Sequence, residues 1–208
     1  MGSPAPLTVQ EFQTLSNVSR ETCDRLAVYL ALLSHWQKRI NLVGGRSLED
    51  GWRRHVLDSA QLWRHLPRGT ASLVDLGSGA GFPGLVLGIM GVAEVHLIES
   101  DSRKCAFLRE AARETGTAVT IHTARIEALT PWSVDIVTAR ALAPLDRLLP
   151  MAYPFLDLGA EGLFLKGKGV FEELTAAEKS WMMAIATFSS QSDPDGVILH
   201  IKNAHPAE

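Results

Sequence analysis

The sequence predicts an α/β protein with a Rossmann-like, mostly parallel sheet, an antiparallel C-terminal strand and a helical N-terminal extension. After residue 70, short β-branched runs alternate with helical segments, a pattern typical of a parallel sheet covered on both faces. Before residue 70, apolar residues recur at helical spacing. The glycine-rich segment VDLGSGAGFPG, residues 74–84, follows the first predicted strand, where doubly wound sheets bind their ligands.

Residues 8–66 are expected to form helices. Ser19 is a plausible N-cap for the first long helix, and Gly44-Gly45 separates that helix from a second one over 48–65. One face of the first helix is apolar and consists of Leu26, Tyr29, Leu30, Leu33, Trp36 and Ile40. The segment Pro67–Thr70 marks a boundary, so the chain divides into a helical cap, 1–69, and a second domain, 70–208.

The strands of the second domain are predicted from five β-branched runs, at 72–76, 95–99, 119–123, 134–138 and 162–166. The clearest intervening helix covers 102–115. Near the C-terminus a helix over about 171–184 is expected to lead into a strand at 186–191. The turn Asp193-Pro-Asp-Gly196 then joins that strand to a final one, which must run antiparallel to it.

Composition limits the class of protein. The chain has 208 residues, 46% of them hydrophobic and 21% charged, which is ordinary for a globular protein. No apolar run is long enough for a membrane span, and the N-terminus does not resemble a secretory signal. Only two cysteines are present, Cys23 and Cys105, which argues against a disulfide framework or a structural zinc. We expect a cytoplasmic protein without a metal or a membrane partner, and a monomer is favoured.

The charge is unevenly distributed along the chain. Residues 1–70 hold nine Lys/Arg and six Asp/Glu, whereas the remainder holds 11 and 17. A basic front on an acidic body suggests contact with an anion such as nucleic acid, although a solvated surface explains the charge equally well.

The glycine-rich segment allows two cofactors. Its residues 79–84, GAGFPG, match the dinucleotide pattern G-x-G-x-x-G, but this match alone is weak. Asp75 and Gly77 precede the match, and Pro83 lacks the N–H that a pyrophosphate cradle needs. The order acid-x-Gly-x-Gly-x-Gly fits S-adenosylmethionine better, because that cofactor has no phosphate.

For S-adenosylmethionine we expect close backbone approach at Gly77, Gly79 and Gly81, where the amino-acid end of the cofactor would lie. Asp75 would act through the loop or through water. Glu99, at the end of the second strand, is placed to accept hydrogen bonds from the two ribose hydroxyls, although a water-exposed strand-end carboxylate is the plain alternative.

The whole pattern resembles one family. The segments VDLGSGAGFPG, LIESDSRKCAFL, TARIEAL, VTARALAPL and GLFLKGKG, with INLVGGRS and RRHVLDSAQL before them, are similar to the glucose-inhibited division protein B family. Its members are bacterial methyltransferases of 16S ribosomal RNA, so the resemblance implies the class I S-adenosylmethionine-dependent methyltransferase fold. It also implies methyl transfer to N7 of a guanine.

The resemblance places cofactor contacts on Gly77 and Phe82, on Ile126 and Glu127 beside the adenine, and on Arg140. Arg140 is also the residue expected to position the substrate, through a phosphate or the guanine edge, unless it forms a structural ion pair. The candidates for RNA contact are Asn41, Arg46, Arg53, Arg54 and His55 in the helical front, and Lys166 and Lys168 after the fifth strand. Plain alternatives remain for several: helix capping by Asn41, pairing of His55 with Asp58, and solvated lysines.

The chemistry of guanine N7 suggests that no general base is needed, because its lone pair is already nucleophilic and no proton leaves. The sequence lacks the Asn/Asp-Pro-Pro-aromatic loop associated with exocyclic amines, and Cys105 is expected in the core rather than as a nucleophile. Three alternatives stay open at this point: a methyltransferase for a small molecule or protein, a dinucleotide-dependent oxidoreductase, and a non-catalytic RNA-binding module.

Overall fold

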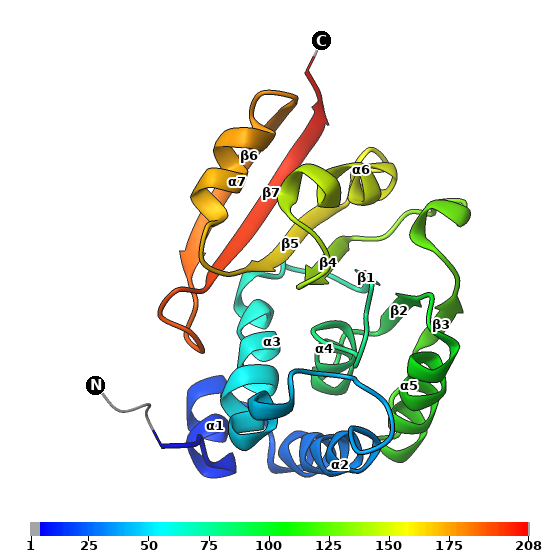
Figure 1. Cartoon of the computed structure of the whole chain (residues 1–208), viewed down its shortest axis with the longest axis vertical. Coiled ribbons are helices and arrows are strands. Elements are labelled where there is room, and N and C mark those ends of the chain that lie inside the picture. Colours follow the sequence, from blue (N-terminus) through cyan, green and yellow to red (C-terminus); the bar gives the residue numbers. More distant parts are fainter. Residues whose placement is uncertain (1–4, 208) are drawn as a thin grey trace.

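The computed structural model of the chain, which describes residues 5–207, has a seven-stranded sheet at its centre (Figure 1). The strand order is β3-β2-β1-β4-β5-β7-β6. The first five strands pair in parallel, whereas β7 runs antiparallel to both β5 and β6. The strands are β1 (Ser72–Leu76), β2 (Glu94–Glu99), β3 (Thr120–Thr123), β4 (Ile136–Arg140), β5 (Glu161–Lys166), β6 (Trp181–Ser189) and β7 (Val197–Pro206). The predicted parallel sheet and its antiparallel C-terminal strand are confirmed.

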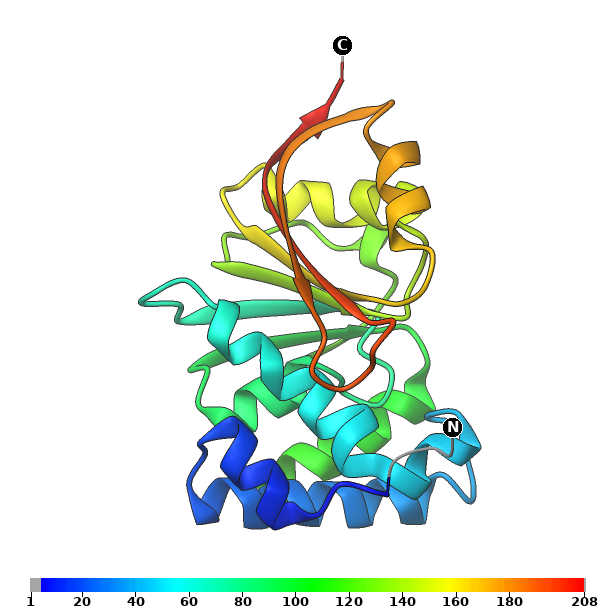
Figure 2. The ribbon, with the colours of Figure 1, turned by 90° about the vertical axis from the view of Figure 1, so that its left-hand side faces the viewer.

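Helices cover the two faces of the sheet. On one face, α4 and α5 contact the strands and the N-terminal helices pack behind them, while α6 and α7 cover the other face (Figures 1 and 2). The N-terminal helices are α1 (Val9–Ser16), α2 (Arg20–Trp36), η1 (Gly45–Asp50), η2 (Trp52–Leu57), α3 (Asp58–Ala60) and η3 (Gln61–His65). The helices between strands are α4 (Gly84–Met90), α5 (Ser102–Glu114), η4 (Ile126–Ala128), α6 (Leu145–Leu156) and α7 (Val170–Ala177).

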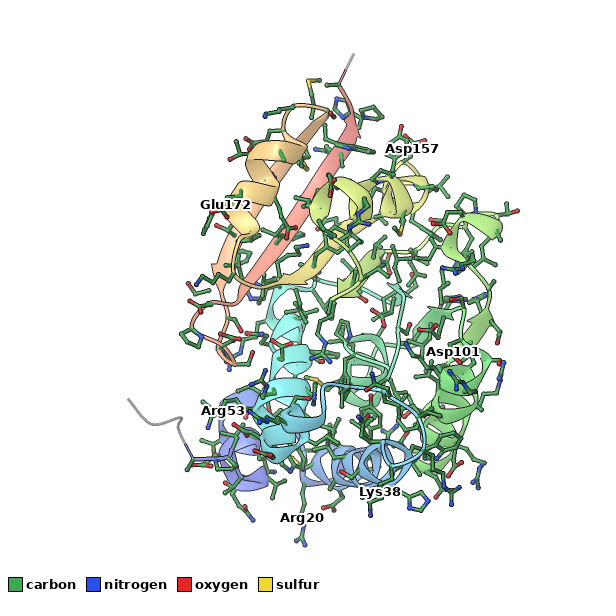
Figure 3. The ribbon with its side chains drawn as sticks, in the orientation of Figure 1. Arg20, Lys38, Arg53, Asp101, Asp157 and Glu172 are labelled. Carbon is green, nitrogen blue, oxygen red and sulfur yellow. The ribbon has the colours of Figure 1, made fainter. Side chains whose placement is uncertain are left out.

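The helical front shares its core with the sheet. Leu26, Tyr29 and Leu33 of α2 are fully buried in the same hydrophobic cluster as Leu73 of β1 and Leu97 of β2. A second cluster fills the space between the opposite face of the sheet and α6 and α7. Charged side chains such as the labelled Arg20, Lys38 and Glu172 project outward from the ribbon (Figure 3). The front is therefore packed against the sheet, which fixes one wall of any site between them.

Local signals explain where the long helices begin. The side chain of Ser19 accepts a hydrogen bond from Thr22 N and caps α2, as predicted. Thr8 and Glu11 form a reciprocal capping box at the start of α1, which the sequence reading passed over. Cys105 is fully buried in the core, also as predicted.

The helical run predicted over 48–65 is confirmed, and it consists of a 3-10 helix, a π-helix, a short α-helix and a second 3-10 helix. One helix prediction was wrong in its extent. The helix predicted over 171–184 ends at Ala177, and strand β6 begins at Trp181. Trp181 is buried and pairs with Pro206 of β7, so sheet pairing overrides the helical spacing of its neighbours.

Within the part of the chain that the structure describes, no helix is long and apolar enough to cross a membrane. The same residues contain no cluster of three His, Cys, Asp or Glu side chains able to hold a metal ion.

Candidate active site

A large open cleft of about 1770 Å³ lies between the helical front and the carboxyl ends of the parallel strands. Three of the polar residues predicted from the sequence line it from the carboxyl ends of parallel strands: Glu99 from β2, Arg140 from β4 and Lys166 from β5. This is the edge at which doubly wound sheets bind ligands.

Glu99 is held rigidly at the floor of the cleft. Its carboxylate accepts one hydrogen bond from Gly79 N at 2.9 Å and another from Asp101 N at 2.7 Å, one on each oxygen. The residue is only 7% exposed, yet it lines the cleft. Each carboxylate oxygen has a further lone pair, so the group can still accept two hydroxyl donors. This arrangement suits the vicinal diol of a ribose.

The three glycines of the loop have left-handed backbones, with φ of +62° at Gly77, +57° at Gly79 and +92° at Gly81. A Cβ at Gly77 would lie 2.5 Å from Leu142 Cδ1, and one at Gly81 would lie 3.0 Å from each of three side-chain atoms. At Gly79 the nearest atom would be 3.8 Å away. Gly79 lines the cleft and has an open side, so of the three it is the position that a ligand can approach closely.

The role expected for Gly81 therefore needs correction. Gly81 is buried, does not line the cleft, and is fixed by packing against Leu85, Leu108 and the Tyr29 hydroxyl. Gly77 borders the cleft, but contact with Leu142 already requires a glycine there. Packing therefore accounts for Gly81, whereas Gly77 meets a packing demand and also borders the cleft, so its cofactor contact stays a prediction.

Asp75 also lies outside the cleft. It is fully buried under the glycine loop, where Thr138 Oγ1 donates to its Oδ1 at 2.7 Å and its Oδ2 has no hydrogen-bond partner among the described residues. Burial raises the pKa of the Asp75 carboxyl to about 6. Its Cβ would lie 2.6 Å from a Cβ at Gly84, so the acid packs directly against the end of the loop. Asp75 can act on a ligand only through the loop.

The other cofactor candidates border the cleft. Ile126 is half-buried and Glu127 exposed on η4, and both line it beside Glu99. Phe82 is almost fully buried and packs against the rings of Tyr29 and His55. The Arg140 guanidinium lies over the same Phe82 ring, 4.6 Å from its centre.

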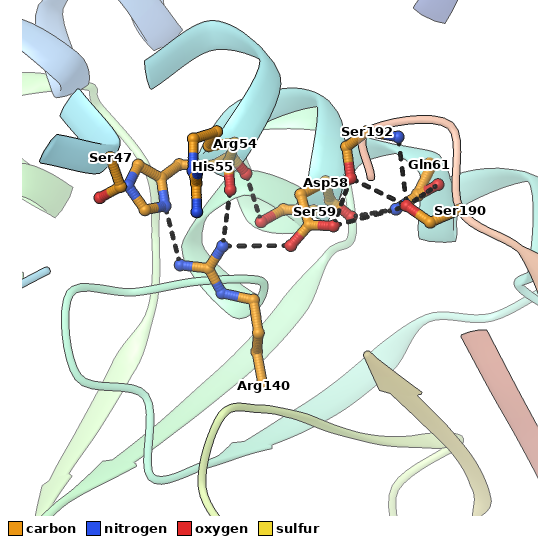
Figure 4. Close-up of polar contacts among 9 residues, drawn as sticks. All are labelled: Ser47, Arg54, His55, Asp58, Ser59, Gln61, Arg140, Ser190 and Ser192. Atoms are coloured by element: carbon orange, nitrogen blue, oxygen red, sulfur yellow. Dashed lines mark hydrogen bonds and ion pairs between the residues drawn. The ribbon is translucent and has the colours of Figure 1, made fainter. Parts of the chain in front are cut away.

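Arg140 joins the sheet to the helical front (Figure 4). Its guanidinium donates to Arg54 O at 3.0 Å, to Asp58 Oδ2 at 3.1 Å and to His55 Nδ1 at 3.0 Å. The structural ion pair that the sequence analysis left open for Arg140 is thus present, with Asp58 as its partner. The expected pairing of His55 with Asp58 is replaced by contact of both residues with Arg140.

His55 is neutral in this network. Arginine only donates hydrogen bonds, so Nδ1 of His55 accepts, and the ring proton lies on Nε2, which donates to Ser47 Oγ at 2.7 Å. Burial, together with the positive charges of Arg140 and Arg54, lowers the pKa of His55 to about 3. His55 is only 5% exposed, so its side chain is structural here rather than a free RNA contact.

The network continues to the β6–β7 turn. Asp58 Oδ1 accepts from Ser192 Oγ at 2.6 Å and from Gln61 Nε2 at 3.2 Å (Figure 4). Gln61 Oε1 accepts from Gln191 N at 2.7 Å. Ser192 also lines the cleft. Asp58 lies 82 residues from Arg140 in the chain, so no local sequence pattern predicts their contact.

The basic candidates separate into two groups. Arg46, Arg54 and Lys168 are exposed, and the first two line the cleft. Arg53 instead pairs with Asp50 at 2.8 Å and donates to Ala5 O at 2.9 Å. Lys166 pairs with Glu173 at 2.6 Å and its side chain is 9% exposed. The geometry therefore argues against Arg53 and Lys166 as phosphate contacts.

Asn41 is exposed and borders the cleft. Its side chain accepts only a long hydrogen bond, 3.4 Å, from Gln37 Nε2. The loop after α2 is held by Gln37, whose side chain accepts from Leu42 N and Val43 N and donates to Val43 O. Asn41 is therefore available to a ligand.

The cleft can accommodate S-adenosylmethionine. Glu99 offers two fixed acceptors to a ribose, Gly79 leaves room for close approach, and Ile126 provides an apolar border on the far side of Glu99. These features come from three different elements, yet they converge on one edge of the sheet.

Solved structures share this fold at low sequence identity. A mutant of MtNAS in complex with S-adenosylmethionine superposes with a TM-score of 0.57 at 13% identity, covering 94% of this chain and 84% of that one. A SAM-dependent methyltransferase from Aquifex aeolicus gives a TM-score of 0.56 at 16% identity, covering 75% and 95%. These similarities support the predicted fold class.

Sequence relatives are much closer. The ribosomal RNA small subunit methyltransferase G of Rhodospirillum rubrum is 58% identical over 201 residues, covering 97% of this chain and 100% of that protein. The protein of the same name from Paramagnetospirillum magneticum is 57% identical, covering 93% and 94%. The GidB family, described as rRNA small subunit methyltransferase G, matches residues 22–205. The chain therefore belongs to the GidB family of rRNA small subunit methyltransferases.

Proposed function

We propose that this protein transfers a methyl group from S-adenosylmethionine to N7 of a guanine in the small-subunit (16S) ribosomal RNA of bacteria. The observation that carries the proposal is the Glu99 carboxylate, oriented by two backbone amides at the floor of the cleft. Membership of the GidB family supports an rRNA substrate and decides against a dinucleotide-dependent oxidoreductase.

The cofactor is placed by residues of the sheet edge. When bound, S-adenosylmethionine supplies a methyl group on a positively charged sulfur. Glu99 would accept from the ribose hydroxyls, and Ile126 and Glu127 would border the adenine. Gly79 would allow the amino-acid end to approach the backbone. Arg140 is tied to the helical front, so its positive charge is neutralised by Asp58 near the cofactor's own cation.

Methylation at N7 fits the groups around the cleft. Both cysteines are buried outside it, so neither is placed as the nucleophile that carbon-5 methylation of a pyrimidine requires. His55 is neutral, buried and doubly hydrogen-bonded, and Glu99 already accepts two amide donors. A reaction at N7 needs no proton acceptor, so holding the base in line with the methyl and the sulfur is the main contribution.

The helical front is proposed to hold the RNA. Arg46 and Arg54 are exposed at the edge of the cleft and are suited to phosphate contact, and Asn41 lies at the same edge. On this proposal residues 1–69 form an RNA-contacting cap for the methyltransferase domain, 70–208, acting as a monomer. Because bacterial ribosomal subunits are made in the cytoplasm, we propose that it acts there.

The test uses small subunits, and the naked 16S RNA extracted from them, from cells that lack this protein. Each is incubated with the purified protein and methyl-labelled cofactor, and the label is located by mass mapping of RNA fragments. N7-methylguanosine is identified independently by reductive cleavage of the chain at that nucleotide. A Glu99→Gln variant, matched in size, should bind the cofactor more weakly. Label on another atom or base would overturn the N7 assignment, and unlabelled RNA would overturn the rRNA substrate.

A further inference from the structure

The four residues between β4 and α6, Ala141–Pro144, form a wall of the cleft directly after Arg140. Lys166 Nζ, at the end of β5, donates to Ala143 O at 3.0 Å and pairs with Glu173 Oε2 at 2.6 Å. The same Glu173 oxygen accepts from Leu145 N at 2.8 Å. One ion pair therefore contacts the loop and the helix that follows it.

The loop is fixed at three points. Arg140, at its start, is hydrogen-bonded to the helical front, and Ala143, near its end, is hydrogen-bonded to Lys166. Between them, Leu142 presses on the glycine loop so closely that a Cβ at Gly77 would lie 2.5 Å away. Loop 141–144 therefore contacts the proposed cofactor loop on one side and borders the open cleft on the other.

The backbone of this loop is strained. Ala141 has a φ of +51°, a left-handed conformation that is unfavourable for a residue with a Cβ. Such strain persists only where the surrounding contacts impose it, and it concentrates at functional sites. Ala141 is exposed in the cleft, so burial of its own side chain does not explain the conformation. The hydrogen bonds of Arg140 before it and of Ala143 after it hold the backbone in this conformation.

We propose that Lys166 and Glu173 are positioning residues, which hold loop 141–144 so that the target base lies in line with the methyl group. This inference rests on the proposed function, and it assigns Lys166 a role different from RNA-backbone contact. A buried, paired ammonium has little to offer a phosphate, whereas Lys168, two residues later, is exposed. Lys168 is thus the matched comparison for Lys166.

The test compares Lys166→Met with Lys168→Met in single-turnover methylation and in RNA binding at several salt concentrations. Because a displacement of about 1 Å at a reacting centre can cost about 100-fold in rate, Lys166→Met should lower the methyl-transfer rate by about 10- to 100-fold. Its RNA affinity and salt dependence should stay unchanged. Lys168→Met, if it loses a phosphate contact, should reduce the salt slope by about 0.7–0.9 instead.

Variants of Glu173 test the same ion pair through its other partner, and they keep the proposal testable if Lys166→Met does not fold. Glu173→Ala should lower the rate as Lys166→Met does, and the double variant should be no slower than Lys166→Met alone. Glu173→Gln keeps an acceptor for Lys166 and Leu145 N, so it should recover most of the rate.

Three outcomes separate the proposals. A wild-type protein that methylates no small-subunit RNA would overturn the proposed function. With active wild type, a Lys166→Met variant that lowers the salt slope would make Lys166 a phosphate contact and overturn the positioning role. An unchanged rate in folded Lys166→Met and Glu173→Ala would also overturn it.

Discussion

Gly77 and Gly79 have nearly the same backbone conformation, but an added methyl group at each should have different effects. At Gly77, alanine would meet Leu142 Cδ1 at 2.5 Å in addition to the strain of a φ of +62°. Backbone strain of about 1–2 kcal/mol and overpacking of about 1–3 kcal/mol together predict a loss of about 2–5 kcal/mol of unfolding free energy. At Gly79, with φ of +57° and no contact closer than 3.8 Å, only the strain remains, about 1–2 kcal/mol.

Cofactor affinity should be affected more by the substitution at Gly79 than by the one at Gly77. The new methyl at Gly79 would occupy open space in the cleft, so we expect Gly79→Ala to weaken S-adenosylmethionine binding by about tenfold or more, equivalent to about 1.4 kcal/mol. Gly77→Ala should act on binding chiefly through stability and the displaced loop.

Chemical denaturation measures the free energy of unfolding, and isothermal calorimetry measures cofactor affinity on the same samples. The assignment of Gly79 to the cofactor fails if folded Gly79→Ala binds with wild-type affinity. The packing role of Gly77 fails if Gly77→Ala is destabilised no more than Gly79→Ala.

Further predictions concern charge. Replacing Arg46 and Arg54 by alanine should reduce the dependence of log RNA affinity on log salt concentration by about 0.7–0.9 per lost phosphate contact. Titrations at several salt concentrations measure this slope, and an unchanged slope would make both residues part of a solvated surface. Burial raises the pKa of Asp75 from 3.8 to about 6, so the folded state binds the proton more tightly than the unfolded state does. Wild-type stability relative to Asp75→Asn should therefore fall by about 3 kcal/mol in total as pH rises from about 3 to about 7, and stay lower above it; parallel stability curves from denaturation would refute this. Asp58→Ala removes the acceptor of Arg140, Gln61 and Ser192, and should lower the free energy of unfolding by about 2–3 kcal/mol. The loss of stability should be smaller when Arg140 is already replaced by methionine; equal losses in both backgrounds would mean that Asp58 and Arg140 are not coupled.

The sheet could be predicted from the sequence because its signals are local. Each parallel strand is a short apolar run, most of them with β-branched residues, and the turn at Asp193–Gly196 leaves the last two strands no arrangement other than antiparallel. The helix predicted through Trp181 failed because short apolar segments satisfy both helical and strand spacing, and only pairing with β7 decides between them. The helical run over 48–65 was predictable from its spacing, whereas its division into 3-10, π and α segments was not.

The site is most directly predictable where a residue's place follows from the strand before it. Glu99, Arg140 and Lys166 end strands, and all three line the cleft. What each side chain does there depends on partners elsewhere in the chain. The sequence predicts an RNA contact at Lys166, but the structure pairs its ammonium with Glu173; it predicts a substrate contact at Arg140, whose guanidinium is bonded to Asp58 and His55. Spacing cannot reveal these pairs.

Arg140 connects the helical front, the glycine loop and loop 141–144. Its backbone ends β4 and begins loop 141–144, its guanidinium covers Phe82 of the glycine loop, and its hydrogen bonds end on the helical front. A reaction at guanine N7 depends on alignment rather than on a proton acceptor, so on the proposed function the separation between the helical front and the glycine loop would bear directly on the rate. A charged hydrogen-bond network holds that distance more firmly than apolar packing alone, because each donor fixes a direction as well as a separation. The polar network around Arg140 is therefore where we expect substitutions far from the methyl group to slow the reaction without weakening cofactor binding.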